Sequence, residues 1–168
     1  LTYCGGVNYP EVNTQDTSTA PGWCSVLTGV WADKNGVTGN GITKGLEYKT
    51  LMTSLVETEV IDSANFITIW GGHFDDDNST YKLEKSYCEE NNLDVKFTLC
   101  STNTISANKA IADINQTDCS DFIFAIYEGT DAAGHGFGFS INNPIYQAGY
   151  QLNDVLAYKT INAIENRE

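Results

Sequence analysis

Apolar residues recur along the chain with two spacings, one typical of helices and one typical of strands. Apolar positions three or four residues apart predict helices at about residues 23–33, 46–60, 80–91, 105–115 and 151–165. Alternating or continuous apolar runs predict strands at 66–70, 94–99, 122–127 and 136–141. The run 122–127 is almost entirely apolar, as in a central strand.

The remaining segments are connections. Residues 1–20 are polar and rich in turn formers, which predicts an irregular N-terminal arm ending at Pro21-Gly22. Residues 36–45 contain several glycines and predict a loop. We find no internal repeat, linker or low-complexity segment, so the sequence predicts a single domain over residues 1–168.

The charge balance excludes two classes of partner. The chain has 22 acidic and 9 basic residues, a formal net charge of −13 and a pI near 4.3. Nucleic acids and anionic lipid surfaces repel such a protein, so we expect no nucleic-acid partner. Apolar runs stay shorter than the roughly 20 residues that span a bilayer, so we expect no membrane insertion.

The chain has an odd number of cysteines. They lack Cys-x-x-Cys spacing, and with two histidines in the whole chain we expect neither a metal nor another cofactor. Either all are reduced, or four form disulfides in an exported protein and one thiol is left over. We favour a secreted or exported protein, and the start at Leu1 indicates a mature or excised segment. The five are Cys4, Cys24, Cys88, Cys100 and Cys119.

Cys24 is the strongest candidate nucleophile among these cysteines. It follows Pro21-Gly22-Trp23, where the first helix is predicted to begin. The positive end of a helix dipole favours the thiolate, and free N–H groups there can bind an oxyanion. The alternative is a small buried residue or half of a disulfide.

His135 is the matching candidate for a general base. It lies between Gly134 and Gly136, directly before the strand predicted at 136–141. Flanking glycines allow close approach, and a rigid strand would hold the imidazole still. His73 instead adjoins the acidic run Asp75-Asp76-Asp77, which lacks the glycine and acidic positions of an EF-hand loop and leaves calcium binding open.

The order of these features resembles minimal papain-like cysteine peptidases of the staphopain-like and C39-like bacterial groups. The resemblance rests on Gly22-Trp23-Cys24-Ser25, on the segment 81–126 and on Gly134-His135-Gly136-Phe137-Gly138-Phe139. It implies an α+β fold in which an N-terminal helix carries the cysteine, helical segments follow, and a mainly antiparallel sheet closes the domain.

The resemblance also implies a function and a set of site residues. In a peptidase or related acyl-transfer hydrolase, Cys24 would attack a peptide carbonyl while His135 takes and returns the proton. Asn153 or Asp154 would orient the imidazole, and Gln15 would assist the oxyanion. The substrate would then be a protein or peptide.

Two alternatives remain beside this hypothesis. One is a non-catalytic secreted domain, such as a binding module, adhesin or toxin, whose cysteines form disulfides. The other concerns the fold, because residues 66–127 have a strand-helix-strand-helix-strand order that suits an open α/β sheet of caspase-like type. That arrangement needs a cysteine after the histidine, and no cysteine follows His135.

Overall fold

The structure is a computed structural model that describes residues 15–167. Most of the predicted arm over residues 1–20 therefore lies outside the described residues. Thr19 and Ala20, its last two members, belong to the first helix.

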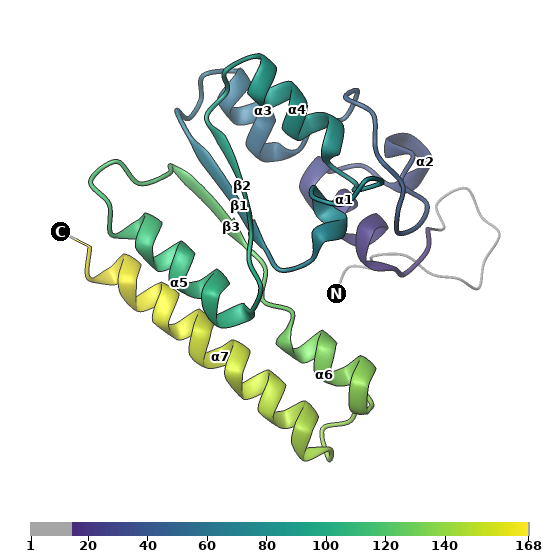
Figure 1. Ribbon diagram of the computed structural model, residues 1–168, viewed down its shortest axis with the longest axis vertical. Coiled ribbons are helices and arrows are strands. Elements are labelled where there is room, and N and C mark those ends of the chain that lie inside the picture. The colour runs from purple at the N-terminus through teal and green to yellow at the C-terminus, as the bar shows by residue number, and fades with distance from the viewer. Residues whose placement is uncertain (1–14, 168) are drawn as a thin grey trace. The chain divides into compact units, whose positions relative to one another are not determined.

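Residues 15–167 form seven α-helices, one short 3-10 helix and three strands (Figure 1). The helices are α1 (Thr19–Thr28), α2 (Ala32–Asn35), α3 (Leu51–Glu57), α4 (Lys82–Glu90), α5 (Asn103–Ile114), α6 (Gly129–Phe137) and α7 (Pro144–Glu165). The strands are β1 (Ala64–Thr68), β2 (Val95–Leu99) and β3 (Phe122–Ala125), with the 3-10 helix η1 at Gly71–His73.

The three strands form one parallel sheet in the order β2-β1-β3. Each strand is followed by a helical connection, and such connections are what parallel neighbours require. The expected α+β fold with a mainly antiparallel sheet is therefore wrong: the chain is an open α/β sheet. The alternative drawn from the strand-helix-strand-helix-strand order of residues 66–127, an open α/β sheet, describes this part of the chain.

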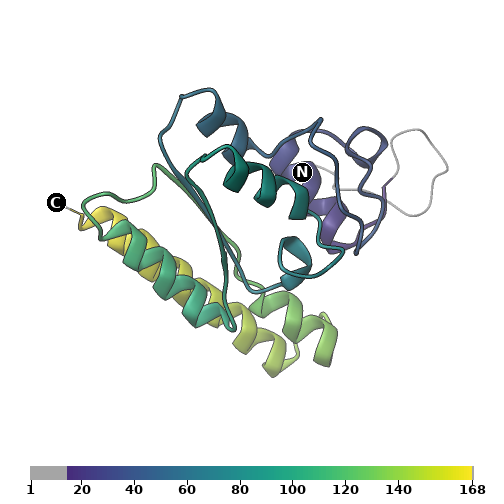
Figure 2. The same ribbon diagram turned by 45° about the horizontal axis from the view of Figure 1, so that its top comes forward.

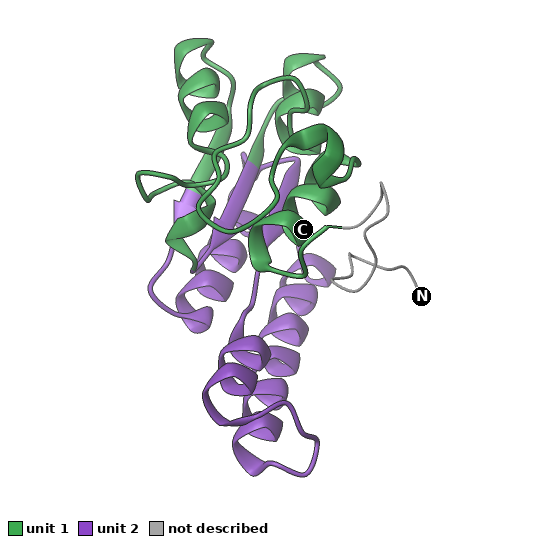
Figure 3. Cartoon of the chain, turned by 90° about the vertical axis from the view of Figure 1, so that its right-hand side faces the viewer, with its two compact units in different colours: residues 1–64, 70–97 green, residues 65–69, 98–168 purple. Residues whose placement is uncertain are grey.

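The chain divides into two compact units (Figure 3). Unit 1 comprises Leu1–Ala64 and Trp70–Phe97, and unit 2 comprises Asn65–Ile69 and Thr98–Glu168. Over the described residues, the structure contains no helix long and apolar enough to cross a membrane.

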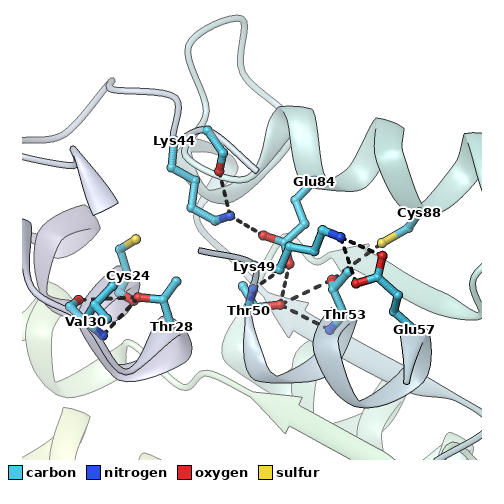
Figure 4. Close-up of polar contacts among 11 residues, drawn as sticks. Cys24, Thr28, Val30, Lys44, Lys49, Thr50, Thr53, Glu57, Glu84 and Cys88 are labelled. Carbon is cyan, nitrogen blue, oxygen red and sulfur yellow. Dashed lines mark hydrogen bonds and ion pairs between the residues drawn. The ribbon is translucent and has the colours of Figure 1, made fainter. Parts of the chain in front are cut away.

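Unit 1 buries an ion pair between Lys44 and Glu84, both almost inaccessible to solvent (Figure 4). Glu84 lies on α4, and its Oε1 also accepts hydrogen bonds from Thr50 N (2.8 Å) and Thr50 Oγ1 (2.6 Å). Thr50 caps α3 by accepting from Thr53 N. A buried carboxylate needs this degree of pairing to offset its lost hydration, so Glu84 ties α3, α4 and the loop before them together.

Unit 2 has an apolar centre around Ile67, Cys100 and Ala110, with Ile123 and Ala125 of β3 packed against it. Helices α5 and α7 lie side by side in Figures 1 and 2.

A buried carboxylate joins three elements of unit 2. Asp113 on α5 accepts hydrogen bonds from Asn65 Nδ2 (2.7 Å), Ser120 N (2.8 Å) and Ser120 Oγ (2.9 Å). These bonds connect α5 to β1 and to the segment that leads into β3, and they offset the lost hydration of the carboxylate.

The strand predicted at residues 136–141 is wrong. Residues up to Phe137 belong to α6, while Phe137, Phe139 and Ile141 are exposed. Alternation with glycine and serine resembles a strand, but these residues have no strand beside them in the described chain. The last helix also begins earlier than predicted, because Asn143 caps it by accepting from Ile145 N (2.9 Å) and Pro144 suits a first turn.

The contact between α6 and α7 depends on Gly149. A Cβ at this position would lie 2.6 Å from the Gly129 carbonyl oxygen and 2.9 Å from Ala133 Cβ. We expect Gly149→Ala to lower the free energy of unfolding by about 1–3 kcal/mol, because backbone cannot move aside cheaply. Gly136→Ala on α6 is the matched control, since a Cβ there meets no atom within 4 Å, and should raise stability by roughly 0.5–1 kcal/mol. Urea denaturation of both variants tests this, and equal effects would contradict it.

Candidate functional site

Cys24 lies in the middle of α1 rather than at its start, and its side chain is fully buried. Burial raises the pKa of its thiol to about 11, and the charge of Lys44 opposes this only in part. Figure 4 shows Cys24 on α1 together with the Lys44–Glu84 pair. The thiol is therefore neutral at physiological pH, whereas a cysteine nucleophile must be a thiolate.

His135 lies in the last turn of α6 and is largely exposed. Its Nε2 is 3.6 Å from Oδ1 of Asp131, one helical turn earlier, and its ring meets Phe139 edge-on at 5.2 Å between centroids. Cys24 belongs to unit 1 and His135 to unit 2.

The other predicted site residues have local partners. Gln15 is buried, and its Oε1 accepts from Ser25 Oγ (3.0 Å) and Ala32 N (3.0 Å), which joins α1 to α2. Asp154 is exposed on α7. Asn153 points into unit 2, where its amide binds the turn between β3 and α6.

That turn gathers ionisable groups at the carboxyl end of β3. Open α/β sheets bind ligands at the carboxyl ends of their strands. Glu128 is half-buried there, and its backbone N–H donates to Asn103 Oδ1 (2.7 Å). Its Oε1 is buried and receives no hydrogen bond from the described residues. Burial raises the pKa of Glu128, and the charge of Asp131 raises it further.

The sequence around this turn is acidic and lacks a basic counterpart. Between Lys109 and Lys159 there are Asp and Glu residues but neither Lys nor Arg. The turn therefore attracts cations. Asp131 and His135 offer a carboxylate oxygen and an imidazole nitrogen, which are common metal ligands.

The described residues do not complete a metal site by themselves. Within residues 15–167, no group of three or more His, Cys, Asp or Glu side chains is placed to hold a metal ion. Asp131 and His135 form a pair of potential ligands without a third such side chain placed beside them among residues 15–167. The loop residues Asp75, Asp76 and Asp77 are exposed and form no such group either.

Unit 1 offers a separate feature at the start of α1. Thr19 is the first residue of this ten-residue helix and is half-buried. The hydroxyl of Ser18, which precedes it, donates to Asp16 Oδ2 (3.3 Å). Ala20 N donates to Asn40 Oδ1 (2.8 Å), which fixes the Asn40 amide beside the helix start. A hydroxyl, an amide and a helix N-terminus together suit an anionic group.

A hollow in unit 2 has a different character. It measures about 610 Å³ and lies between α5, β3 and α7. Its walls are mainly apolar, with Ile123, Ala125, Ile161 and Ile164 among them, and Arg167 lies at its edge. It has no paired ligand groups comparable with Asp131 and His135.

Comparison with known families decides which chemistry is relevant. The model of the family described as type I phosphodiesterase / nucleotide pyrophosphatase matches residues 5–168. The chain belongs to this family. No curated protein and no solved structure gives a significant match.

Membership of the phosphodiesterase family corrects the functional hypotheses drawn from the sequence. The resemblance to papain-like cysteine peptidases is wrong, and with it the assignment as a cysteine-dependent peptidase; the caspase-like comparison falls as well. Nothing supports the alternative of a non-catalytic secreted binding, adhesin or toxin domain. The peptidase motifs were short runs rich in glycine and aromatic residues, which many folds contain.

The disulfide expectation is also wrong for the described cysteines. Cys24, Cys88, Cys100 and Cys119 are all free thiols. The first three are buried, and Cys119 is partly exposed. Cys4 lies outside the described residues.

Sequence reasoning missed Glu128 and Asp131 although both were visible. Asp131 and His135 are four residues apart, which places two side chains on one face of a helix. The alternation of Phe and Gly after His135 predicts a strand, and this local pattern hides the helical spacing of Asp131 and His135.

The buried thiol leads to a labelling prediction. At pH 8 a thiol with a pKa near 11 is ionised in about one molecule in a thousand. We expect iodoacetamide to leave Cys24 unmodified in the folded protein and to modify the partly exposed Cys119 first. Mass mapping after timed labelling measures both, and unfolding in urea should expose Cys24. Equal rates for the two thiols in the folded protein would show that Cys24 is not buried.

Proposed function

We propose that this chain hydrolyses phosphodiester or pyrophosphate bonds, with Asp131 and His135 helping to hold a divalent cation. The observation that carries the proposal is the 3.6 Å pair of carboxylate oxygen and imidazole nitrogen on one turn of α6, directly after β3. Membership of the phosphodiesterase family supports the reaction class.

The surroundings of the pair fit a cation. Glu128 Oε1 is a buried acceptor that no described residue satisfies, and the nearby charge of Asp131 makes ionisation of Glu128 costly. A cation beside these carboxylates would relieve both costs. A carboxylate and an imidazole suit Zn²⁺ or Mn²⁺.

The substrate's charge gives an independent reason. A phosphodiester or pyrophosphate is an anion, and the segment between Lys109 and Lys159 has no Lys or Arg to receive it. When bound, a divalent cation would neutralise phosphate oxygens and polarise the phosphorus centre. Asp131 and His135 would hold that cation, and the Glu128 carboxyl is close enough to Asp131 for their charges to interact.

Unit 1 by itself offers a candidate nucleophile for phosphoryl transfer, at the start of α1. We assign this role to Thr19, because it is the first residue of α1 and the Asn40 amide oxygen accepts from the backbone N–H of the next residue, Ala20. The Thr19 oxygen would bond to phosphorus as its proton passes to water, while the bond to the leaving oxygen breaks and that oxygen departs with the electron pair and takes up a proton from water. Water would then cleave the threonyl ester and restore the hydroxyl.

The cation pair is tested by Asp131→Asn and His135→Gln. Each change removes one ligand, so we expect at least a tenfold weaker affinity for Mn²⁺ or Zn²⁺ in calorimetry. Hydrolysis of bis(4-nitrophenyl) phosphate should fall by about a hundredfold or more, because the charge of the phosphate is then less well compensated.

Asp118→Asn is the matched control for these two variants. Asp118 is an exposed carboxylate of unit 2 outside the turn, so this change removes the same charge as Asp131→Asn. It should leave cation affinity within about twofold. Cation affinity of Asp131→Asn and His135→Gln equal to that of the control would overturn the assignment.

Thr19→Val tests the nucleophile. We expect it to abolish turnover and the covalent ester, which acid quenching and mass spectrometry of the Thr19 peptide would detect in the wild-type protein. Thr17→Val is the control, since Thr17 is exposed and precedes the helix. Full activity in Thr19→Val would mean that water attacks phosphorus directly.

A further inference from the structure

We infer that Asn153 is a positioning residue that holds the turn between β3 and α6 so that Asp131 and His135 keep their spacing as cation ligands. The inference rests on the proposed function for its consequence in catalysis. Its structural basis is a set of hydrogen bonds within unit 2.

Asn153 binds the turn at two points. Its Nδ2 donates to the carbonyl oxygen of Tyr127 (3.0 Å) and to Oγ1 of Thr130 (3.1 Å). Tyr127 ends the segment that leaves β3, and Thr130 directly precedes Asp131 on α6. One amide of α7 therefore fixes both the exit from the strand and the first turn of the helix that carries the ligand pair.

A second amide holds the same turn from α5. Asn103, the first residue of α5, accepts the backbone N–H of Glu128 through its Oδ1 (2.7 Å). Thr102 caps α5 by accepting from Ile105 N, which fixes the start of that helix. Residues 127–130 are thus held by side chains from two helices.

Close packing leaves the turn little room to move. A Cβ on Gly129 would lie 2.6 Å from Asn153 Oδ1 and 3.0 Å from Asn103 Nδ2. Both asparagines therefore touch the backbone of the turn. A change of side chain at position 153 therefore alters the packing against Gly129, the first residue of α6.

The two hydrogen bonds donated by Nδ2 explain why position 153 needs an amide. The Oδ1 atom of Asn153 is buried and receives no hydrogen bond from the described residues, and the two donated bonds must offset that cost. Aspartate has the same shape but no donor, so it would leave the Tyr127 carbonyl unsatisfied. It would also add a third negative charge beside Glu128 and Asp131.

These hydrogen bonds replace the role that the sequence indicated for Asn153. An asparagine that orients an imidazole uses its amide on the histidine ring. Here Nδ2 is committed to Tyr127 and Thr130 instead. Asn153 acts on His135 only through the placement of α6.

Asn153→Leu tests the inference, with Asn162→Leu as the matched control. Leucine removes the amide donor and adds no charge, and Asn162 is exposed on the same helix, so both variants carry the same change of side chain. We expect Asn153→Leu to weaken Mn²⁺ affinity by about tenfold, as outer-shell changes do. Saturating Mn²⁺ should restore most of the rate of phosphodiester hydrolysis. A purely structural role would instead lower the unfolding midpoint and leave the Mn²⁺ affinity of the folded protein unchanged.

Amide hydrogen exchange separates failure of this inference from failure of the proposed function. Backbone amides of residues 128–133 should exchange at least about tenfold faster in Asn153→Leu and at the wild-type rate in Asn162→Leu. Absence of cation binding and hydrolysis in the wild-type protein would overturn the proposed function. Wild-type exchange and wild-type Mn²⁺ affinity in Asn153→Leu would overturn the positioning role.

Discussion

Parallel pairing of β1 with β3 is the constraint on which unit 2 depends. β2 and β3 lie on opposite sides of β1, so no tight turn can join them and the chain crosses from β2 to β3 through α5. The same pairing fixes the edge of the sheet at which β3 ends, and the turn with Glu128 and Asp131 follows directly. Helix α7 then lies beside α5 and α6, where Asn153 reaches that turn. The position of Asp131 and His135 is therefore a consequence of the sheet.

Buried charges have a different role in each part of the chain. Glu84 and Asp113 are buried but fully engaged, the first with Lys44 and Thr50, the second with Asn65 and Ser120. Such groups hold elements together. Glu128 is also partly buried, yet its Oε1 has no donor among the described residues. A buried acceptor without a donor, close to a second carboxylate, is the pattern expected where a ligand binds. In this respect Glu128 differs from Glu84 and Asp113.

His73 shows that a buried histidine need not belong to a site. Its ring is inaccessible to solvent, lies edge-on to Trp70 at 4.8 Å and stacks on Tyr81 at 5.8 Å between centroids. Burial lowers its pKa to about 4, so the imidazole is neutral in the folded protein. Because the unfolded chain takes up the proton more readily, this residue favours folding above pH 6.5 and loses that contribution as the pH falls to about 4.

The sequence by itself determined most of the helices and the strands near 66–70, 94–99 and 122–127, because their apolar spacing is local. It also singled out His135 and Asn153, but with a cysteine that the tertiary structure buries as a neutral thiol. Local pattern could not separate a strand at 136–141 from the end of α6, since that choice depends on packing of Gly129 and Ala133 against Gly149. Only the tertiary structure decided that Asn153 binds the turn, because that contact joins residues more than twenty positions apart in sequence. Only the tertiary structure showed that Asp131 lies beside His135, because that contact depends on helix α6, which the pattern did not predict.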